Sequence, residues 1–391
     1  MPHSKRILIS GAGITGLTLA FWLKKHGFEP VVIDRAPGPR PGADILHLFG
    51  AGYRVAEKMG LVGRIRGHDL NFGEVEFVDV MGRRTGGLGL EPLREMLDNR
   101  ICHLPRGALE ATLLEKIGDS IPIRYSQNIR RLDRNPDSVS VLFEDHDWSA
   151  FDLVVGADGQ LSNVRRQAFG WDTLFERYCG QYVATFTLQD MHPGNRILAH
   201  ATARRLVGIF GRGELSSAYL MFKSAHRLDL NETDISGQKR LVKDIFMGMG
   251  WEVDRILESM TRAPDFQFGP VSQIRMDTWA QNRVALVGDA AYCPSLLSGQ
   301  GASLAMAGAY ILAGELRKAD GRPIPAFKAY EAKMRSVIER KQQASLKVSI
   351  TPKTRLGAWA SGKLVDWLGY TLVLKSVTGR LLSDPLELAD Y

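Results

Sequence analysis

The sequence has few cysteines and lacks the patterns that mark secreted, membrane-spanning or metal-binding proteins. Its three cysteines, Cys102, Cys179 and Cys293, lie far apart in a chain of 391 residues, which argues against a disulfide framework and a zinc site. No run of about 18 apolar residues is present, so we expect no membrane span. No signal-peptide pattern precedes the first apolar strand, and we therefore expect a cytoplasmic protein.

The basic residues are not clustered, although the formal net charge is +7. Nucleic-acid binding favours clustered basic residues interleaved with aromatic ones, and here pairs such as Arg130-Arg131 and Arg204-Arg205 are spread along the chain. The nine histidines show no metal-ligand spacing. We therefore expect no nucleic-acid partner and no metal. We also find no Ser-His-Asp set and no carboxylate pair, so we expect no catalytic side chain of these kinds.

The first 35 residues instead predict a β–α–β unit with a glycine-rich turn. A short apolar strand over residues 6–10 leads into Gly11-Ala12-Gly13-Ile14-Thr15-Gly16, and a helix follows as far as Gly27. This order fits G-x-G-x-x-G, in which the glycines permit a tight turn, close approach of a pyrophosphate and close packing of helix on strand. The free N–H groups of the helix N-terminus favour phosphate. We therefore expect dinucleotide binding.

An acid ends the second strand of this unit and restricts the choice of nucleotide. Asp34 follows Gly16 by eighteen residues, near the position where an acid accepts hydrogen bonds from the ribose hydroxyls. A 2′-phosphate would be repelled there, so NADP is disfavoured at this site and FAD and NAD remain. The residues that we expect to contact the nucleotide at this end are Gly11, Gly13, Ile14, Thr15, Gly16, Asp34 and Arg35.

Two later strand ends favour FAD. Asp158-Gly159 follows the apolar strand 153–157, and Gly288-Asp289 follows the strand 283–287. An Asp at a strand end can accept a hydrogen bond from a ribityl hydroxyl. The segment Gly299-Gln300-Gly301 then begins a helix rich in small residues, whose backbone N–H groups can face an anionic reduced flavin ring.

With these motifs in this order, residues 5–345 resemble the class A FAD-dependent monooxygenases, the para-hydroxybenzoate hydroxylase family. Arg106 in Leu104-Pro105-Arg106-Gly107 matches the family arginine that opens a helix and contacts FAD. The segments Tyr292-Cys293-Pro294-Ser295 and Gly308 to Leu316 are similar to those of the tetracycline destructases. Arg40 matches an arginine near the flavin in that subfamily, where it would meet the phosphates of NADPH; a loop-surface arginine is the equal alternative.

The resemblance implies an α/β fold. It consists of a Rossmann-like FAD-binding domain of the glutathione-reductase/para-hydroxybenzoate-hydroxylase type, an inserted antiparallel β-sheet domain for substrate, and C-terminal helices. We place the FAD-binding domain at residues 1–174 with 281–345, the sheet domain at 175–280 and a helical cap at 346–391. Helical spacing predicts an apolar stripe within residues 359–377 of this cap, which we expect to dock on the body as a lid; a membrane-surface helix and plain packing are the alternatives.

The resemblance also implies the chemistry. NADPH or NADH would reduce FAD, and O2 would then form a flavin C4a-hydroperoxide that hydroxylates a polycyclic or aromatic small molecule. The flavin performs the difficult step and the protein orients the substrate and excludes water. We expect no second dinucleotide fold, a transient nicotinamide cofactor, and a monomer.

The inserted sheet is expected to supply the substrate pocket. Alternation in the strand 183–189 puts Thr185, Thr187 and Gln189 on one face, where they would line a pocket or simply meet solvent. The full set of expected substrate residues is Thr187, Gln189, Tyr219, Met221, Phe268 and Pro294, and core packing is the alternative for the large apolar ones.

Some positions depart from the family. Tyr292 stands where a His is frequent, Leu296 stands where a Pro is frequent, and His47 and Phe49 stand where relatives often carry other polar or charged residues near the flavin. The substrate therefore stays open. The alternatives are a simple aromatic hydroxylase, a tailoring enzyme of secondary metabolism, a reductase or halogenase of the same fold, and a non-catalytic FAD protein. No Trp-x-Trp-x-Ile-Pro motif supports a halogenase.

Overall fold

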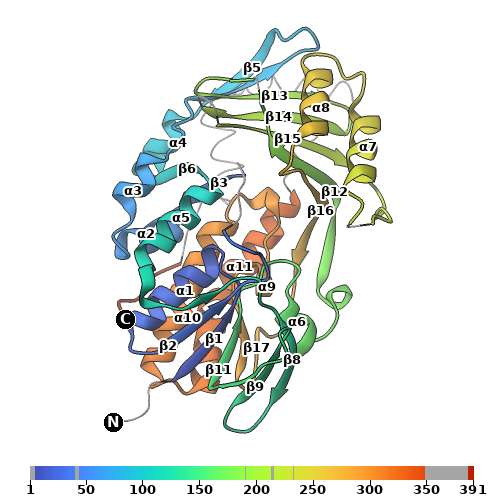
Figure 1. Ribbon diagram of the computed structural model, residues 1–391. Coiled ribbons are helices and arrows are strands. Elements are labelled where there is room, and N and C mark those ends of the chain that lie inside the picture. Colours follow the sequence, from blue (N-terminus) through green and yellow to red (C-terminus); the bar gives the residue numbers. More distant parts are fainter. Residues whose placement is uncertain (1–4, 40–43, 190, 213–214, 232, 348–385) are drawn as a thin grey trace.

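The computed structural model describes residues 5–39, 44–189, 191–212, 215–231, 233–347 and 386–391. Figure 1 shows a parallel-sheet domain below and a larger sheet above, with helices between and around them. Among the described residues, no helix combines the length and the apolar character needed to cross a bilayer.

The parallel sheet forms the core of the first domain. Its six strands have the order β17-β18-β11-β1-β2-β7. Their bounds are Ala280–Gln281 for β17, Val284–Leu286 for β18, Leu153–Gly156 for β11, Arg6–Ser10 for β1, Glu29–Ile33 for β2 and Ile123–Arg124 for β7. All neighbours run parallel except β17. The central strands are buried and mostly apolar beyond the first residues of β1 and β2, as expected for a sheet covered on both faces.

Helices and a small antiparallel sheet cover this core. Helix α1 (Ile14–Lys25) packs on β1, β2, α5 (Arg106–Ile117) and α10 (Gly301–Lys318), and α10 also packs on α2 (Gly50–Lys58) and α11 (Pro323–Lys347). The three-stranded sheet of β8 (Ile129–Arg134), β9 (Val139–Phe143) and β10 (Trp148–Phe151) contacts β1 through β10. The short helices are α3 (Val62–Gly67), α4 (Glu91–Met96), α6 (Asn163–Ala168) and α9 (Asp289–Tyr292). The predicted β–α–β unit and the parallel placement of the later strands are confirmed.

The second sheet has seven strands, in the order β16-β12-β15-β14-β13-β4-β5. Their bounds are Gln267–Ile274 for β16, Glu176–Thr187 for β12, Leu215–Lys223 for β15, Arg205–Arg212 for β14, Arg196–Thr202 for β13, Glu74–Val78 for β4 and Arg84–Gly89 for β5. The predicted domain boundary is wrong at one point, because β4 and β5 come from the segment assigned to the first domain. Strand β13 pairs with β4 in parallel, whereas the other pairs are antiparallel.

The two faces of the seven-stranded sheet have different neighbours. Helices α7 (Ile235–Phe246) and α8 (Val253–Arg262) cover the outer face, where Ala184, Phe186 and Leu220 join their apolar core. The inner face carries Met221 and Val271, which pack against Leu297 of the first domain. A two-stranded ribbon, β3 (Ile45–Phe49) with β6 (Ile101–Pro105), lies between the two sheets.

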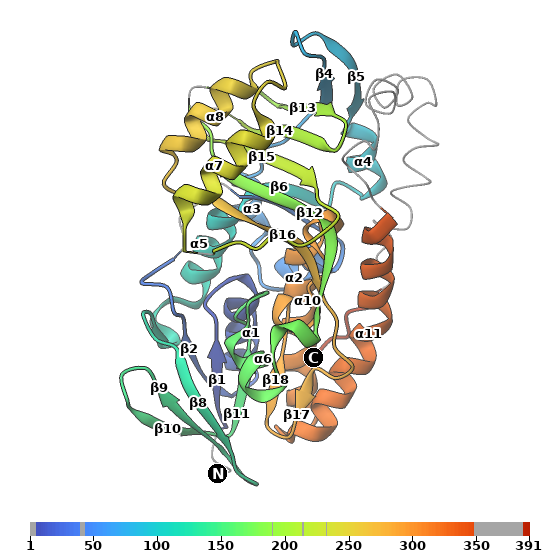
Figure 2. The ribbon, with the colours of Figure 1, turned by 90° about the vertical axis from the view of Figure 1, so that its right-hand side faces the viewer.

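The last six residues of the chain dock on the first domain. Helix α11 runs along the side of the molecule toward the second sheet (Figure 2), and most of the predicted helical cap, residues 348–385 with the apolar stripe, lies outside the described residues. Tyr310 Oη donates to the carbonyl oxygen of Ala389 at 2.6 Å, and Tyr391 Oη donates to Glu315 at 2.7 Å. The Tyr391 ring lies against Gly314, where an added Cβ would be 2.1 Å from the ring.

This contact predicts a context-dependent effect at Gly314. Gly314→Ala should destabilise the wild-type protein, by about 1–2 kcal/mol, because the new methyl group displaces Tyr391. In a Tyr391→Ala background the same change should be neutral or stabilising, by up to about 1 kcal/mol, since alanine is the better helix residue. Thermal melting of the four proteins measures both effects, and an equal loss in the two backgrounds would contradict the contact.

Candidate FAD-binding and active site

The glycine-rich turn is held against the end of β11 by backbone contacts. Gly11 has a φ of +115°, and a Cβ there would lie 2.3 Å from the carbonyl oxygen of Ala157. A Cβ at Gly16 would lie 1.8 Å from the carbonyl oxygen of Gly11. Only glycine allows these approaches, so the turn and the Asp158 segment are fixed to each other.

The acid at the end of β2 lies beside this turn. One oxygen of Asp34 accepts from the N–H of Ala12 at 2.8 Å, and the other accepts from the N–H of Ala36 at 2.8 Å. Each oxygen keeps a further lone pair, and the side chain is partly exposed, as is that of the more open Arg35. The position therefore suits the acceptor of ribose hydroxyls that the sequence predicts.

Arg106 brings a positive charge to the turn. It is the first residue of α5, and its N–H donates to the carbonyl oxygen of Asp44 at 2.7 Å. A Cβ at Gly13 would lie 3.6 Å from Arg106 Nη2, and Glu110 accepts from Arg106 Nε at 2.9 Å. Gly13 thus presents backbone without a side chain beside the Arg106 guanidinium, and Glu110 orients that guanidinium. This arrangement suits a pyrophosphate.

The Gly-Asp motif meets the first motif through a second close contact. Gly288 has a φ of +68°, and a Cβ there would lie 2.5 Å from Thr15 Oγ1 on α1. Asp289, the next residue, is partly exposed and lies beside the start of α10, with its Oδ1 3.9 Å from a Cβ built at Gly301. Burial raises the pKa of the Asp289 carboxyl, and the Arg106 guanidinium opposes that rise.

Asp158 forms hydrogen bonds within its own turn. Its carboxylate accepts from Ser162 Oγ at 2.5 Å and from the N–H groups of Asn163 and Val164 at 2.8 and 3.1 Å. Burial raises the pKa of Asp158, while these hydrogen bonds lower it. The side chain therefore caps the start of α6 and shapes the turn that carries Gly159, and a direct bond to a ribityl hydroxyl is not needed to explain it.

Arg165 is a structural residue that sequence reasoning missed. Its side chain is fully buried, and it donates to the carbonyl oxygen of Ala290 at 2.8 Å, to that of Gln160 at 2.6 Å and to Asp172 at 2.5 Å. It thereby joins the Asp158 turn to helix α9. A buried arginine in a polar segment gives no periodic signal that would have revealed this link.

The loop before α10 is shaped by its own serines. Ser295 Oγ accepts from the N–H of Leu297 at 3.1 Å, and Ser298 Oγ accepts from the N–H of Gln300 at 3.1 Å. Gly299 has a φ of +62°, the left-handed region that favours glycine. The loop then delivers Gly301 as the first residue of an 18-residue helix, so the helix N-terminus faces the predicted flavin end.

The two family departures in this segment have different explanations. Tyr292 is buried beneath α10, where a Cβ at Gly308 would lie 1.9 Å from its hydroxyl oxygen. Its hydroxyl also lies 3.3 Å from that of Tyr330, so Tyr292 fills the space that Gly308 leaves. Leu296 is 51% exposed, and nothing in the described residues explains why it replaces a proline.

The predicted substrate residues divide among three places. Tyr219, Met221 and Thr185 lie on the inner face of the sheet, where Tyr219 Oη accepts from the N–H of Ile45 at 2.9 Å. Thr187 donates to Asp265 at 2.5 Å, and Gln189 is exposed. Pro294 is buried against α11, where its carbonyl oxygen accepts from Ser345 Oγ at 2.9 Å.

Phe268, one of the expected substrate residues, lies on the outer face of the sheet. It pairs across the sheet with Ala184, whose side chain belongs to the outer face, and its ring packs on Tyr182, Phe222 and Phe266. Because cross-strand partners share a face, Phe268 points toward α7 and α8 and not toward the first domain. Its alternative assignment, core packing, is the one that the structure supports.

Asp44 is a second residue that the sequence did not reveal. Its carboxylate accepts from Thr185 Oγ1 at 3.0 Å and from Gln267 Nε2 at 3.1 Å, and its carbonyl oxygen accepts from the N–H of Arg106. One residue therefore connects the inner face of the sheet to the arginine of the nucleotide site. The partners are far apart in sequence, so no local pattern indicates the contact.

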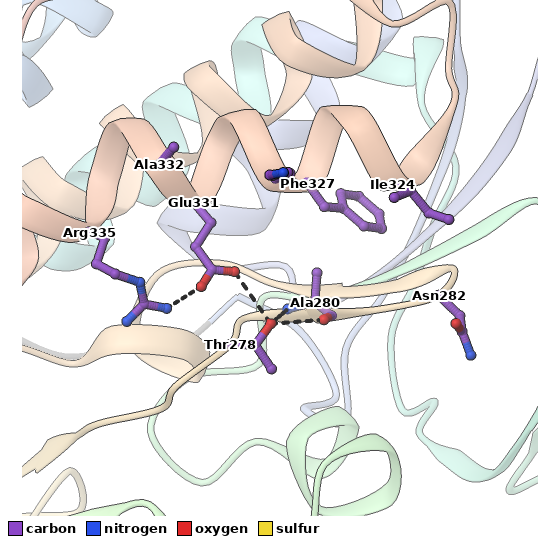
Figure 3. A pocket seen from close by; sticks show the side chains of 9 residues that line it. Thr278, Ala280, Asn282, Ile324, Phe327, Glu331, Ala332 and Arg335 are labelled. Atoms are coloured by element: carbon purple, nitrogen blue, oxygen red, sulfur yellow. Dashed lines mark hydrogen bonds and ion pairs between the residues drawn. The ribbon is translucent and has the colours of Figure 1, made fainter.

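A pocket elsewhere on the first domain is not formed by the predicted motifs. It lies between α11 and β17 and is lined by residues such as Thr278, Phe327, Glu331 and Arg335 (Figure 3). Glu331 accepts from Arg335 and from the N–H of Trp279, so its charge is already paired. None of the lining residues belongs to the predicted motifs. In the described part of the chain, no cluster of His, Cys, Asp or Glu could hold a metal ion.

A family model described as an FAD binding domain matches residues 5–344. The chain belongs to this FAD-binding family. A flavin-dependent monooxygenase of Legionella longbeachae is 36% identical over 352 residues, which cover 89% of this chain and 90% of the relative. Two solved tetracycline destructases, Tet(55) and Tet(51), each match with a TM-score of 0.84 over the whole of both chains, at 30% and 27% identity. The predicted fold class, FAD and a class A FAD-dependent monooxygenase are thereby confirmed.

The residues present fit FAD. Gly13 offers open backbone next to a helix N-terminus and to the Arg106 guanidinium. Asp34 offers a partly exposed carboxylate beside the glycine-rich turn, and Asp289 offers one near the Arg106 guanidinium. Arg40, the residue proposed to meet NADPH, lies outside the described residues.

Asp289→Ala should weaken FAD retention, because it removes a charged acceptor beside Arg106 and the start of α10. Hydrogen bonds to charged groups contribute about 1.5–3 kcal/mol, so the dissociation constant for FAD should rise about 10- to 100-fold. Flavin fluorescence titration of the apoprotein measures it. Asp244→Ala, on the exposed face of α7, is the matched control, and equal affinities for the two variants would refute the role of Asp289.

Asp158→Ala should lower thermal stability, by about 1–2 kcal/mol, because it leaves the first N–H groups of α6 without their cap. Asp158→Asn should lose less, since its amide oxygen still accepts from these groups. Melting of the apoproteins separates this role from direct cofactor binding. If both variants released FAD while the apoproteins kept their melting temperature, the side chain would contact the cofactor as the sequence predicted.

Proposed function

We propose that this monooxygenase uses NADPH or NADH and O2 to hydroxylate a polycyclic small molecule, and that tetracycline-like compounds are the first class to test. The observation that carries the proposal is the match to Tet(55) over all of both chains. The inner face of the seven-stranded sheet supports it, because this face packs on the Leu297 loop that precedes α10.

The bound FAD would supply hydride acceptance and oxygen activation. The chain's own residues would bind and orient it: Gly13 and Arg106 at the pyrophosphate, Asp34 at the ribose, and Asp289 with the α10 N-terminus toward the flavin end. The apolar contact of Met221, Val271 and Leu297 would exclude water on the sheet side. No described side chain is needed as a covalent nucleophile.

The proposed substrate wall is narrower than the sequence indicates. We keep Tyr219 and Met221 and add Thr185, since all three lie on the inner face. Thr187 is engaged by Asp265 and Gln189 is exposed at the strand end, so they are weaker candidates, and Pro294 would contribute only as backbone support. The Tyr219 hydroxyl is buried, and burial raises its pKa further above the ordinary value of a tyrosine, so it would act as an uncharged hydrogen-bonding group.

The nicotinamide cofactor would bind transiently and away from the ADP site. Asp34 is committed to the first ribose, and a 2′-phosphate placed there would meet its negative charge. We therefore propose that NADPH approaches the flavin from outside the ADP site. Arg40 stays a candidate for its phosphates, and a monomer stays the expected oligomeric state.

One set of assays tests the proposal. The purified protein, with its flavin confirmed by absorption, is mixed with NADPH or NADH and either a tetracycline or a simple phenol, and nicotinamide oxidation and product mass are recorded. We expect substrate-stimulated oxidation and a product of one added oxygen atom with a tetracycline. A hydroxylated phenol with unmodified tetracyclines would favour the aromatic hydroxylase instead. Oxidation without any oxygenated product would indicate a reductase.

A further inference from the structure

Two histidines from neighbouring strands form a pair beside the flavin-end loop. His47 on β3 and His103 on β6 are direct cross-strand partners. Their Nδ1 atoms lie 2.7 Å apart, with the rings inclined at 79°. A Cβ built at Gly299 would lie 3.6 Å from His47 Cδ2, so the edge of His47 that carries Nε2 is the one next to the loop.

Both histidines are uncharged at physiological pH. Burial lowers the pKa of His47 to about 4. Burial, then the neighbouring His47 and Arg94, lowers the pKa of His103 to about 2. The charged groups near the pair are Arg94 and Asp69, which lie 3.5 Å apart and oppose each other behind His103, where Asp69 also accepts from the N–H of His103.

The short Nδ1–Nδ1 distance requires one donor and one acceptor. Two lone pairs or two N–H groups would repel at 2.7 Å. His103 Nε2 is buried and has no hydrogen-bond partner among the described residues. Buried N–H groups without a partner are rarer in proteins than buried acceptors with an unused lone pair. His103 therefore carries its proton on Nδ1 and donates to His47, which leaves the His47 proton on Nε2.

We propose that His47 is a fixed, uncharged hydrogen-bond donor to the isoalloxazine ring of bound FAD, and that His103 is the positioning residue that holds His47 in this tautomer. The proposal rests on the flavin end of the site lying at Gly299-Gln300-Gly301. A donor at this place stabilises the reduced ring, which is richer in electrons, and it adds to the positive end of α10. It moves no proton, because neither histidine changes its charge.

The first experiment needs no flavin. Nitrogen-15 NMR of the histidine-labelled apoprotein distinguishes the two tautomers by their two-bond couplings, and the His47→Phe and His103→Leu variants assign the signals. We expect His47 to carry its proton on Nε2 and His103 on Nδ1, with no titration of either between pH 6 and 8. A proton on His47 Nδ1, or titration of His47 in this range, would overturn the proposal even if FAD binding is as described.

The second experiment compares three variants of the holoprotein. His103→Asn places an amide donor where Nδ1 stood and should keep the tautomer, whereas His103→Leu offers no donor and His47→Phe removes the group itself. A net hydrogen bond contributes about 0.5–1.5 kcal/mol. Reduced FAD, relative to oxidised FAD, should therefore bind about 2- to 10-fold less tightly to the Leu and Phe variants. The midpoint potential, measured against a reference dye, should become more negative in these two and stay close to wild type in His103→Asn.

The outcomes separate the donor role from simple packing. Equal potentials in wild type and His47→Phe, with FAD bound to both, would refute the proposal. Equal shifts in His103→Asn and His103→Leu would show that His103 acts by packing and not through its Nδ1 proton, which also refutes it. If the wild-type protein itself does not retain FAD, the proposed function fails, and the tautomers of the apoprotein still decide the state of the histidine pair.

Discussion

The structure depends on backbone contacts that only glycine permits. The ends of β1, β11 and β18 converge because Gly11 lies against Ala157 and Gly288 lies against Thr15, at distances that a Cβ would prohibit. These contacts bring together three motifs that are up to 278 positions apart in the chain, from Gly11 to Asp289. Asp289 follows directly in the chain and lies near Arg106 and the start of α10, so this junction is the nucleotide site that we propose.

A second set of contacts couples this proposed nucleotide site to the seven-stranded sheet. Asp44 binds Thr185 and Gln267 through its side chain and Arg106 through its backbone. The contact of Leu297 with Met221 and Val271 ties the flavin-end loop to the same sheet face. Changes in the sheet are therefore expected to reach the proposed cofactor site through these contacts.

Much of the first domain could be predicted, because its signals are local. The apolar strands, the glycine turn, the acid at Asp34 and the small-residue helix after Gly301 lie in short segments whose spacing carries the chemistry. The order of the motifs, together with the family resemblance, identified FAD. The alternation of β12 also placed Thr185 and Phe186 on opposite faces correctly, since period 2 is a property of the strand itself.

The rest was decided by contacts between distant segments. Alternation separates two faces but does not say which neighbour covers each, so the sequence left Phe268 between a substrate contact and core packing, and only the packing of α7 and α8 decided for the core. Strand β4 joins β13 more than 100 residues later, and the carboxylate of Asp158 accepts hydrogen bonds from the N–H groups at the start of α6. The sequence by itself determined the cofactor, through short-range chemistry in fixed order. Only the tertiary structure decided which side chains lie together at the proposed site, including the His47–His103 pair, because that depends on pairing and packing between distant segments.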